Sequence, residues 1–142
     1  DIVGDGTEAD NLRKQASTLP CETKICFHGW LEAGKPNWKE LYESASIFVF
    51  LSNQENFPVC LLEARLAGLI VIANDIPGNR EVLGKFAFYV QQLEPRQVSI
   101  AINQALDLSA EERERWRKAS RDEAVRHFGW KSIIERYEKL YI

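Results

Sequence analysis

The chain has 142 residues, of which 45% are hydrophobic and 27% are charged, a composition typical of a globular domain. This length is enough for one domain that buries roughly two-thirds of its unfolded surface. The net charge of −3 argues against a dedicated nucleic-acid-binding protein, which normally carries an excess of basic residues. The sequence starts at Asp1 and contains no methionine, so we expect it to be a segment of a longer protein.

Strands and helices are predicted to alternate along the chain, which is the pattern of βα units around a parallel sheet. Apolar, β-prone runs predict strands, the first being only the end of one, over residues 1–3, 24–27, 47–51, 69–72 and 87–90. Caps and helical spacing predict helices over residues 7–16, 37–45, 58–67, 79–83, 95–105, 109–126 and 133–141. We therefore predict a single α/β domain over residues 1–142 with a doubly wound, Rossmann-like parallel sheet.

Two glutamates flank the turn after the predicted strand 47–51, which is apolar throughout, as a strand buried on both faces should be. Glu55 lies at the carboxyl end of this strand, where open α/β sheets bind ligands, and Glu63 lies in the next helix. Pro58 suits the first turn of that helix and Gly68 suits its end. The plain alternative is that both glutamates are solvated, as most are. However, an unpaired carboxylate in a largely buried helix is costly, so ligand hydroxyls are reasonable partners for Glu63.

The start of the same helix is a candidate anion site. Backbone N–H groups in a first helical turn have no partner within the helix, and the helix dipole favours negative charge there. We therefore expect a phosphate to lie over the amides of Phe57, Val59 and Cys60.

The spacing of the two glutamates, with Phe57-Pro58 and Leu62-Glu63-Ala64, resembles the signature of retaining GT-B glycosyltransferases, especially family four. Further segments resemble that family in the same order along the chain, namely residues 2–6, 27–31, 73–81 and 128–130. The resemblance covers nearly the whole chain and implies the C-terminal, donor-binding half of a GT-B fold. The implied reaction moves a sugar from a nucleotide sugar to a glycan or lipid-linked acceptor. It retains the anomeric configuration and uses no metal or other cofactor.

The resemblance also implies what lies outside the chain. Family-four donor domains begin with a further strand and helix, which carry an Arg and a Lys that face the donor diphosphate. No position in this sequence matches either residue, and the separate acceptor-binding domain has no counterpart. We therefore expect residues 1–142 to be an N-terminally truncated donor domain that is inactive alone.

The resemblance assigns a different part of the donor to each glutamate. Glu63 would accept hydrogen bonds from the two ribose hydroxyls, a task that suits a fixed carboxylate. Glu55 would be the catalytic residue, which holds a sugar hydroxyl and orients the anomeric carbon. Negative charge grows on the diphosphate as the sugar leaves, so the amides at the helix start would stabilise the transition state. A UDP-sugar is the favoured donor, and a GDP-sugar is the second candidate.

The predicted donor-binding residues near the N-terminus have competing interpretations. Gly29, Trp30 and Leu31 match the family's base-binding turn, but Trp30 equally suits a core aromatic. Gly4 and Gly6 lack a third glycine at Rossmann spacing, so they favour a tight turn beside the ligand cleft over a phosphate-binding loop.

Three further donor-binding predictions depart from the family's pattern. Gly78 and Asn79 lie in a loop that in the family often carries paired glycines near the donor sugar. Asn79 also suits the cap of a following helix. Asn56 replaces the glycine usual after the first glutamate, and Asn tolerates the left-handed backbone that such a turn would need.

The remaining sequence features favour ordinary structural roles. Cys21, Cys26 and Cys60 lack metal-site spacing, which favours free thiols in a reducing cytoplasm over a disulfide or a metal centre. The helix predicted over residues 109–126 mixes both charge signs, with i,i+4 pairs such as Glu111–Arg115, which favours a solvated face. The alternative is a patch at the inner face of the plasma membrane, where a lipid-linked acceptor would lie. No apolar run approaches membrane-spanning length, and we expect a cytoplasmic protein with no nucleic-acid partner.

Two other functions stay open from the sequence. A non-catalytic GT-B subunit would bind nucleotide sugar or a partner enzyme, but it would have no need of both glutamates. A GT-B-type sugar-nucleotide epimerase would need further catalytic carboxylates and a histidine, for which only His28 is placed. A general likeness of residues 76–81 to enzymes of surface polysaccharide or glycolipid assembly favours polysaccharide biosynthesis.

Overall fold

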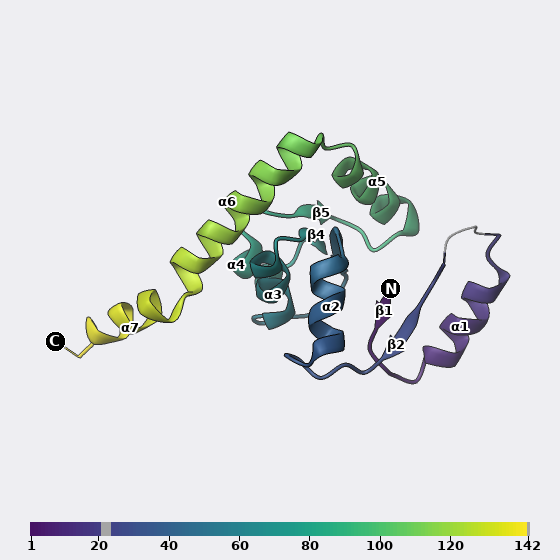
Figure 1. The fold of residues 1–142 in the computed structure, drawn as a ribbon, viewed down its shortest axis with the longest axis horizontal. Helices are drawn as coiled ribbons and strands as arrows, with labels where there is room; N and C mark the ends of the chain where they lie inside the picture. The colour runs from purple at the N-terminus through teal and green to yellow at the C-terminus, as the bar shows by residue number, and fades with distance from the viewer. Residues whose placement is uncertain (21–23, 142) are drawn as a thin grey trace. The chain divides into compact units, whose positions relative to one another are not determined.

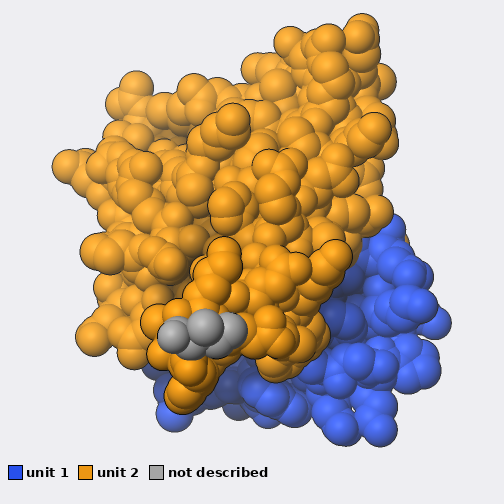
Figure 2. All heavy atoms as spheres, turned by 90° about the vertical axis from the view of Figure 1, so that its left-hand side faces the viewer, with its two compact units in different colours: residues 1–43 blue, residues 44–142 orange. Residues whose placement is uncertain are grey.

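The computed structural model describes residues 1–20 and 24–141, in which strands and helices alternate as predicted (Figure 1). The described strands are β1 Ile2–Val3, β2 Phe27–Gly29, β3 Ile47–Phe50, β4 Ile70–Asn74 and β5 Phe88–Val90. The described helices are α1 Ala9–Thr18, α2 Pro36–Ser44, α3 Val59–Ala67, α4 Pro77–Leu83, α5 Pro95–Leu106, α6 Ala110–Phe128 and α7 Trp130–Glu138. The chain divides into two compact units, residues 1–43 and residues 44–142, which Figure 2 colours blue and orange.

The first unit contains a short parallel pair of strands. Ile2 of β1 lies opposite Phe27 of β2, and Val3 lies opposite Gly29. The strand predicted over residues 24–27 instead runs from Phe27 to Gly29. Its partner β1 has only two residues, and these lie opposite Phe27 and Gly29. The cap of α1, expected within residues 7–10, lies at Glu8, and the helix runs on to Thr18, beyond its predicted end near Ala16.

The second unit is built around a parallel sheet with the strand order β3-β4-β5. The central strand β4 is buried along all five residues, which explains its uninterrupted apolar sequence. On one face of the sheet, Ile70 and Ile72 pack with Ala101 and Ala105 of α5. Successive strand residues point to opposite faces, so Val71 and Ala73 face the side on which α3 packs against β4. The α/β class, with parallel strands and flanking helices, is confirmed.

The strand β3 differs from its prediction. It is an edge strand of its sheet, and its side chains are only partly buried or exposed. Val49 is 44% exposed, so burial on both faces is wrong for this strand. An apolar run alone does not distinguish a central strand from an edge strand, because both favour β-branched and aromatic residues.

A buried arginine joins α3 to α6, which pack together. The Arg65 side chain is 1% exposed and donates hydrogen bonds to the carbonyl of Val82 and to the hydroxyl and carbonyl of Ser120. It also forms an ion pair with Glu123 and lies over the ring of Phe86. This cluster, which the sequence reading missed, fixes α3 against the second half of α6.

The ends of the C-terminal helices show one confirmed and one wrong prediction. The capping box at Ser109 is confirmed, because its hydroxyl accepts from the Glu112 amide while the Glu112 carboxylate accepts from the Ser109 amide. The last helix ends at Glu138, so Leu140 and Tyr141 lie beyond it and are exposed. Cys26 and Cys60 are free thiols, as predicted, and Cys21 lies outside the described residues. Within the described part of the chain, no helix has both the length and the apolar character needed to cross a membrane.

Candidate functional site

The two glutamates occupy the positions predicted from the sequence. Glu55 lies in the loop between the end of β3 at Phe50 and the start of α3 at Val59, at the carboxyl edge of the parallel sheet. Glu63 lies in the second turn of α3. Pro58 is the N-cap residue and so precedes the first turn, whereas Gly68 ends the helix with a left-handed φ of 79°, as predicted.

The pKa of the Cys60 thiol is affected by the negative charges of both glutamates. Burial, followed by the negative charges of Glu63 and Glu55, raises the pKa of Cys60 to about 11. Cys60 and Glu63 are three residues apart and therefore share one face of α3. The loop glutamate and the helix glutamate are thus both close enough to this half-buried thiol to raise its pKa.

Glu63 is a carboxylate in a partly desolvated position. Burial raises the pKa of Glu63 above its ordinary value. The desolvated carboxylate is therefore better served by hydrogen-bond donors than by bulk water, and ligand hydroxyls would supply them. Phe57 and Val59, by contrast, have exposed side chains, and the edge of the Phe57 ring contacts the ring of Phe128 at 5.5 Å between centroids.

The start of α4 lies directly under the Glu55 loop. A Cβ atom added at Gly78 would lie 2.6 Å from the carbonyl carbon of Glu55 and 3.0 Å from the carbonyl oxygen of Asn56, with the Glu55 oxygen closer still. Real side chains do not approach backbone atoms this closely, so only glycine fits here. The structure therefore brings Gly78 against Glu55 and Asn56 and gives a packing reason for this glycine.

Asn79 has a different structural role from the helix cap that was considered. The helix starts at Pro77 with Ile76 as its N-cap residue, so Asn79 lies inside α4 and is fully buried. Its amide nitrogen donates to the backbone oxygen of Asn74 at 2.9 Å and to the Asn74 side-chain oxygen at 3.1 Å. The expectation of a cap is therefore wrong, because Pro77 already starts the helix two residues earlier.

Asn74, which the sequence reading did not single out, connects this helix to the loop. Its side-chain oxygen accepts from the Ser52 amide at 3.1 Å, and its side-chain nitrogen donates to the Ser52 carbonyl at 2.6 Å. Asn74 is 5% exposed and is the last residue of β4. The sequence signal was a polar residue at the end of a run of five buried apolar residues, 69–73, because a buried amide needs specific partners.

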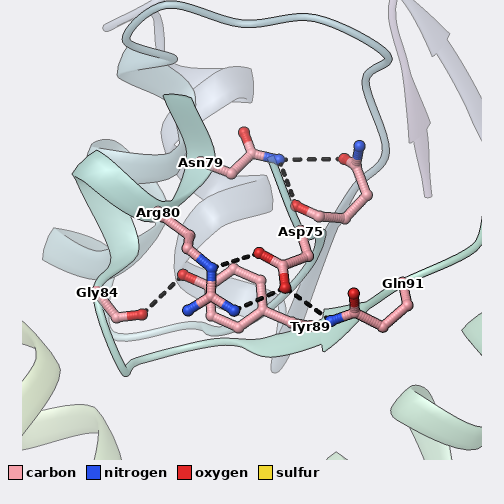
Figure 3. Close-up of polar contacts among 7 residues, drawn as sticks. Asp75, Asn79, Arg80, Gly84, Tyr89 and Gln91 are labelled. Carbon is pink, nitrogen blue, oxygen red and sulfur yellow. Dashed lines mark hydrogen bonds and ion pairs between the residues drawn. The ribbon is translucent and has the colours of Figure 1, made fainter. Parts of the chain in front are cut away.

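A second polar cluster lies beside Asn79 and is drawn in Figure 3. Asp75 forms an ion pair with Arg80 and accepts from Gln91 at 2.7 Å, and Arg80 lies over the ring of Tyr89. The hydrogen bond from Arg80 is the main cause that lowers the pKa of Asp75. Burial raises the pKa of Tyr89, whose hydroxyl donates to the Gly84 carbonyl at 2.7 Å. These partners stabilise the carboxyl ends of β4 and β5.

Asn56 does not use the backbone conformation that its sequence suggested. In the described part of the chain, positive φ angles occur only at Gly4, Gly29, Gly34, Gly68 and Gly84. The left-handed turn expected at Asn56 is therefore wrong, and its replacement of the family's glycine needs no special tolerance.

The candidate residues of the first unit are described by themselves. Gly4 and Gly29 have φ angles of +124° and +66°, and the Gly4 amide donates to the Gly29 carbonyl at 2.8 Å. Two turns that need glycine therefore meet at the end of the β1–β2 pair, with Gly6 and Leu31 following them. Trp30 is 79% exposed, which removes the interpretation of this side chain as a core aromatic. Across residues 1–20 and 24–141, no three His, Cys, Asp or Glu side chains gather into a group that could hold a metal ion.

Comparison with known proteins shows the family to which this chain is related. Residues 1–123 match the model of the family described as glycosyl transferases group 1. Spore coat protein SA of Bacillus subtilis is 38% identical over 105 residues, which are 71% of this chain and 28% of that protein. The chain therefore spans under a third of the length of this relative.

Solved glycosyltransferase structures share the fold. The pneumococcal O-GlcNAc transferase GtfA, solved in complex with UDP and GlcNAc, matches with a TM-score of 0.74 and 24% identity. This match covers 99% of the present chain and 28% of GtfA. WaaG, a glycosyltransferase involved in lipopolysaccharide biosynthesis, matches with a TM-score of 0.69 and 21% identity over 86% of the chain and 32% of WaaG. The fold is thus the α/β fold of GT-B glycosyltransferases.

Proposed function

The chain belongs to the group 1 glycosyl transferases, and from this premise we propose that it is the donor-binding domain of a retaining, family-four GT-B enzyme. The enzyme moves a sugar from a nucleotide sugar to a glycan or lipid-linked acceptor without a metal ion. The observation that carries this proposal is the pair of carboxylates, Glu55 and Glu63, near one thiol at the carboxyl edge of a parallel sheet.

Glu63 accepts hydrogen bonds from the ribose hydroxyls in this proposal. Its partly desolvated carboxylate supports the role, because such a group is stabilised by fixed donors more than a solvated one would be. The diphosphate lies over the first turn of α3, near Phe57, Val59 and Cys60, where the helix N-terminus favours negative charge.

Glu55 is the proposed catalytic residue, which holds a hydroxyl of the donor sugar. Its loop rests on Gly78 at the start of α4, and Asn56 and Asn79 flank the same contact. A fixed loop supports a role in orienting the anomeric carbon, because misplacing a reacting atom by even an ångström costs rate. Contact of Gly4, Gly6, Gly29, Trp30 and Leu31 with a donor stays a prediction.

UDP is the proposed nucleotide, and GDP is the alternative to be titrated beside it. The co-crystallised UDP of GtfA supports this choice only as a likeness between folds. A lipid-linked acceptor at the inner face of the plasma membrane and a role in polysaccharide biosynthesis are proposed on a similar footing, from the likeness in fold to WaaG, which takes part in lipopolysaccharide biosynthesis.

The proposal is tested by replacing each glutamate with glutamine and measuring binding by calorimetry. Glu63→Gln exchanges one acceptor oxygen for a donor and should weaken UDP and a UDP-sugar equally, by about 1–3 kcal/mol. Glu55→Gln should leave UDP binding unchanged and weaken only the UDP-sugar. Equal losses for both ligands in both variants would contradict this division of roles.

Glu135→Gln is the matched control, because Glu135 is an exposed glutamate on another helix of the same unit. It should leave both affinities unchanged. Binding of neither UDP nor GDP by the wild-type chain would favour a non-catalytic subunit that contacts a partner enzyme. Conversion of a bound UDP-sugar to its epimer would favour the epimerase.

A further inference from the structure

A chain of buried amides runs from α4 through the end of β4 to the first residues of the Glu55 loop. Asn79 donates to Asn74, and Asn74 forms two hydrogen bonds with Ser52, one to each of its backbone groups. The last ladder pair between β3 and β4 joins Phe50 and Ala73. The Asn74 side chain therefore replaces a backbone pairing at the point where β3 has ended.

The orientation of the Asn74 amide is determined by its partners. Its oxygen accepts from the Ser52 amide and from the Asn79 nitrogen, while its own nitrogen donates to the Ser52 carbonyl. If the amide were flipped, its nitrogen would face two donors, the Ser52 amide and the Asn79 nitrogen, and its oxygen would face the Ser52 carbonyl, an acceptor. The Asn74 side chain can therefore form hydrogen bonds with the Ser52 backbone in one orientation only.

The buried amide of Asn79 leaves one of its polar atoms unpaired within the described part of the chain, which destabilises the fold. Among the described residues, its side-chain oxygen is buried and has no hydrogen-bond partner. An apolar side chain at this position would leave no unpaired acceptor, so packing alone does not explain the amide. Its two donated hydrogen bonds to Asn74 do, because they hold the residue that in turn holds Ser52.

A second contact fixes the loop three residues further on. Gly78 lies against the carbonyls of Glu55 and Asn56 with no space for a side chain. The first turn of α4 therefore supports the loop at two points, at Ser52 through the amides and at Glu55 by direct packing. Between them, the Ser52 hydroxyl donates to the Gln54 carbonyl at 3.1 Å.

We propose that Asn74 and Asn79 are positioning residues for the carboxylate of Glu55, which they place by fixing Ser52 relative to the first turn of α4. Both side chains are buried, so in this proposal they act through Ser52, and this role replaces the donor contact predicted for Asn79. This inference rests on the proposed role of Glu55 in holding the donor sugar. It adds that selectivity for the sugar over the bare nucleotide depends on a buried amide pair one layer beneath the loop.

The first test is amide hydrogen exchange of the loop, which needs no ligand. Asn74→Ala removes the partners of both Ser52 backbone groups, so exchange at residues 52–56 should accelerate by roughly tenfold relative to wild type. Ser120→Ala is the matched control, because it removes another buried polar partner in the same unit without touching the loop. Unchanged loop exchange in Asn74→Ala would overturn the proposal.

The second test separates positioning from a general loss of stability. Asn74→Ala should weaken a UDP-sugar by about fivefold or more while UDP binding stays within about twofold. Added to Glu55→Gln, it should cause no further loss, because the carboxylate it positions is already gone. A loss for UDP as large as for the UDP-sugar, or additive losses in the double variant, would overturn the proposal.

If Asn74→Ala fails to fold, the same two tests are made with Asn79→Leu. This variant keeps the branched shape of the side chain, removes both donated hydrogen bonds and leaves the Asn74–Ser52 pair in place, so we expect the same pattern at smaller size. If the wild-type chain binds neither ligand, the proposed function fails, and the exchange experiment alone then decides the positioning role.

Discussion

The carboxylate of Glu63 lowers the stability of the ligand-free protein near neutral pH, although the proposed function needs this carboxylate. Burial raises the pKa of this carboxyl, so its ionised form is disfavoured in the folded chain relative to the unfolded one. The stability associated with the protonated form is fully present below the unfolded-state pKa and is lost as pH rises through the higher folded-state pKa. Near neutral pH, the ionised carboxylate therefore destabilises the folded chain.

We expect Glu63→Gln to raise the melting temperature slightly at pH 7 and to have no effect near pH 3, where the wild-type carboxyl is protonated in both states. Thermal unfolding followed by circular dichroism at the two pH values measures this. The exposed Glu135→Gln should show no comparable gain at pH 7. A wild type that is more stable than Glu63→Gln at pH 7 would mean that the carboxylate already has donors in the free protein.

At this scale, the sequence predicts residues whose partners are local and misses those whose partners are distant. The interval from Glu55 to Glu63 spans one loop and one helix start, so its geometry follows from short-range rules. The contact of Asn74 with Ser52 joins residues 22 positions apart. Only the strand register brings them together, and no local pattern specifies that register.

The helices of the second unit are held in place partly by polar clusters that replace apolar packing. Arg65 is the clearest case, because it directs its guanidinium to the Val82 carbonyl on α4 and to Ser120 and Glu123 on α6. Since Glu63 lies two residues before Arg65 in α3, the cluster also fixes the helix that presents this carboxylate. A guanidinium suits the task because its planar fork serves several acceptors at once.

We expect Arg65→Met to destabilise the chain by roughly 2–4 kcal/mol, because buried acceptors lose their donor. Arg65→Lys should recover only part of this, since an ammonium cannot reach all the acceptors. Chemical denaturation measures both. Arg115→Met is the matched control, because Arg115 forms an exposed ion pair with Glu111 and should cost less than about 0.5 kcal/mol. Equal effects at the two positions would contradict a structural role for the cluster.

Helix ends and strand burial were predictable from the sequence to different degrees. Ser109 and Gly68 act through hydrogen bonds and backbone angles within one turn, and both predictions are confirmed. The edge position of β3 depends on which strands pair beside it, and its predicted burial was wrong. Local chemistry therefore predicts these two helix ends, whereas the exposure of a strand is a property of the assembled sheet.

The whole chain corresponds to a minority of each relative. It spans 28% of spore coat protein SA and 28% of GtfA, although the match to GtfA covers 99% of the chain itself. Most of each relative therefore lies outside the part that matches this chain. Sugar transfer needs an acceptor beside the anomeric carbon, and we expect the acceptor-binding residues in that other part.

We therefore expect residues 1–142 to bind a UDP-sugar without transferring the sugar. Binding uses groups within the chain, namely Glu55, Glu63 and the start of α3, whereas rate acceleration requires both reactants to be held in a fixed geometry. Calorimetry with the UDP-sugar measures the first, and release of UDP over several hours with candidate glycan acceptors measures the second. Glu55→Gln serves as the reference for background hydrolysis. Rapid transfer by the wild-type chain alone would contradict this expectation, because it would place a complete acceptor site within these 142 residues.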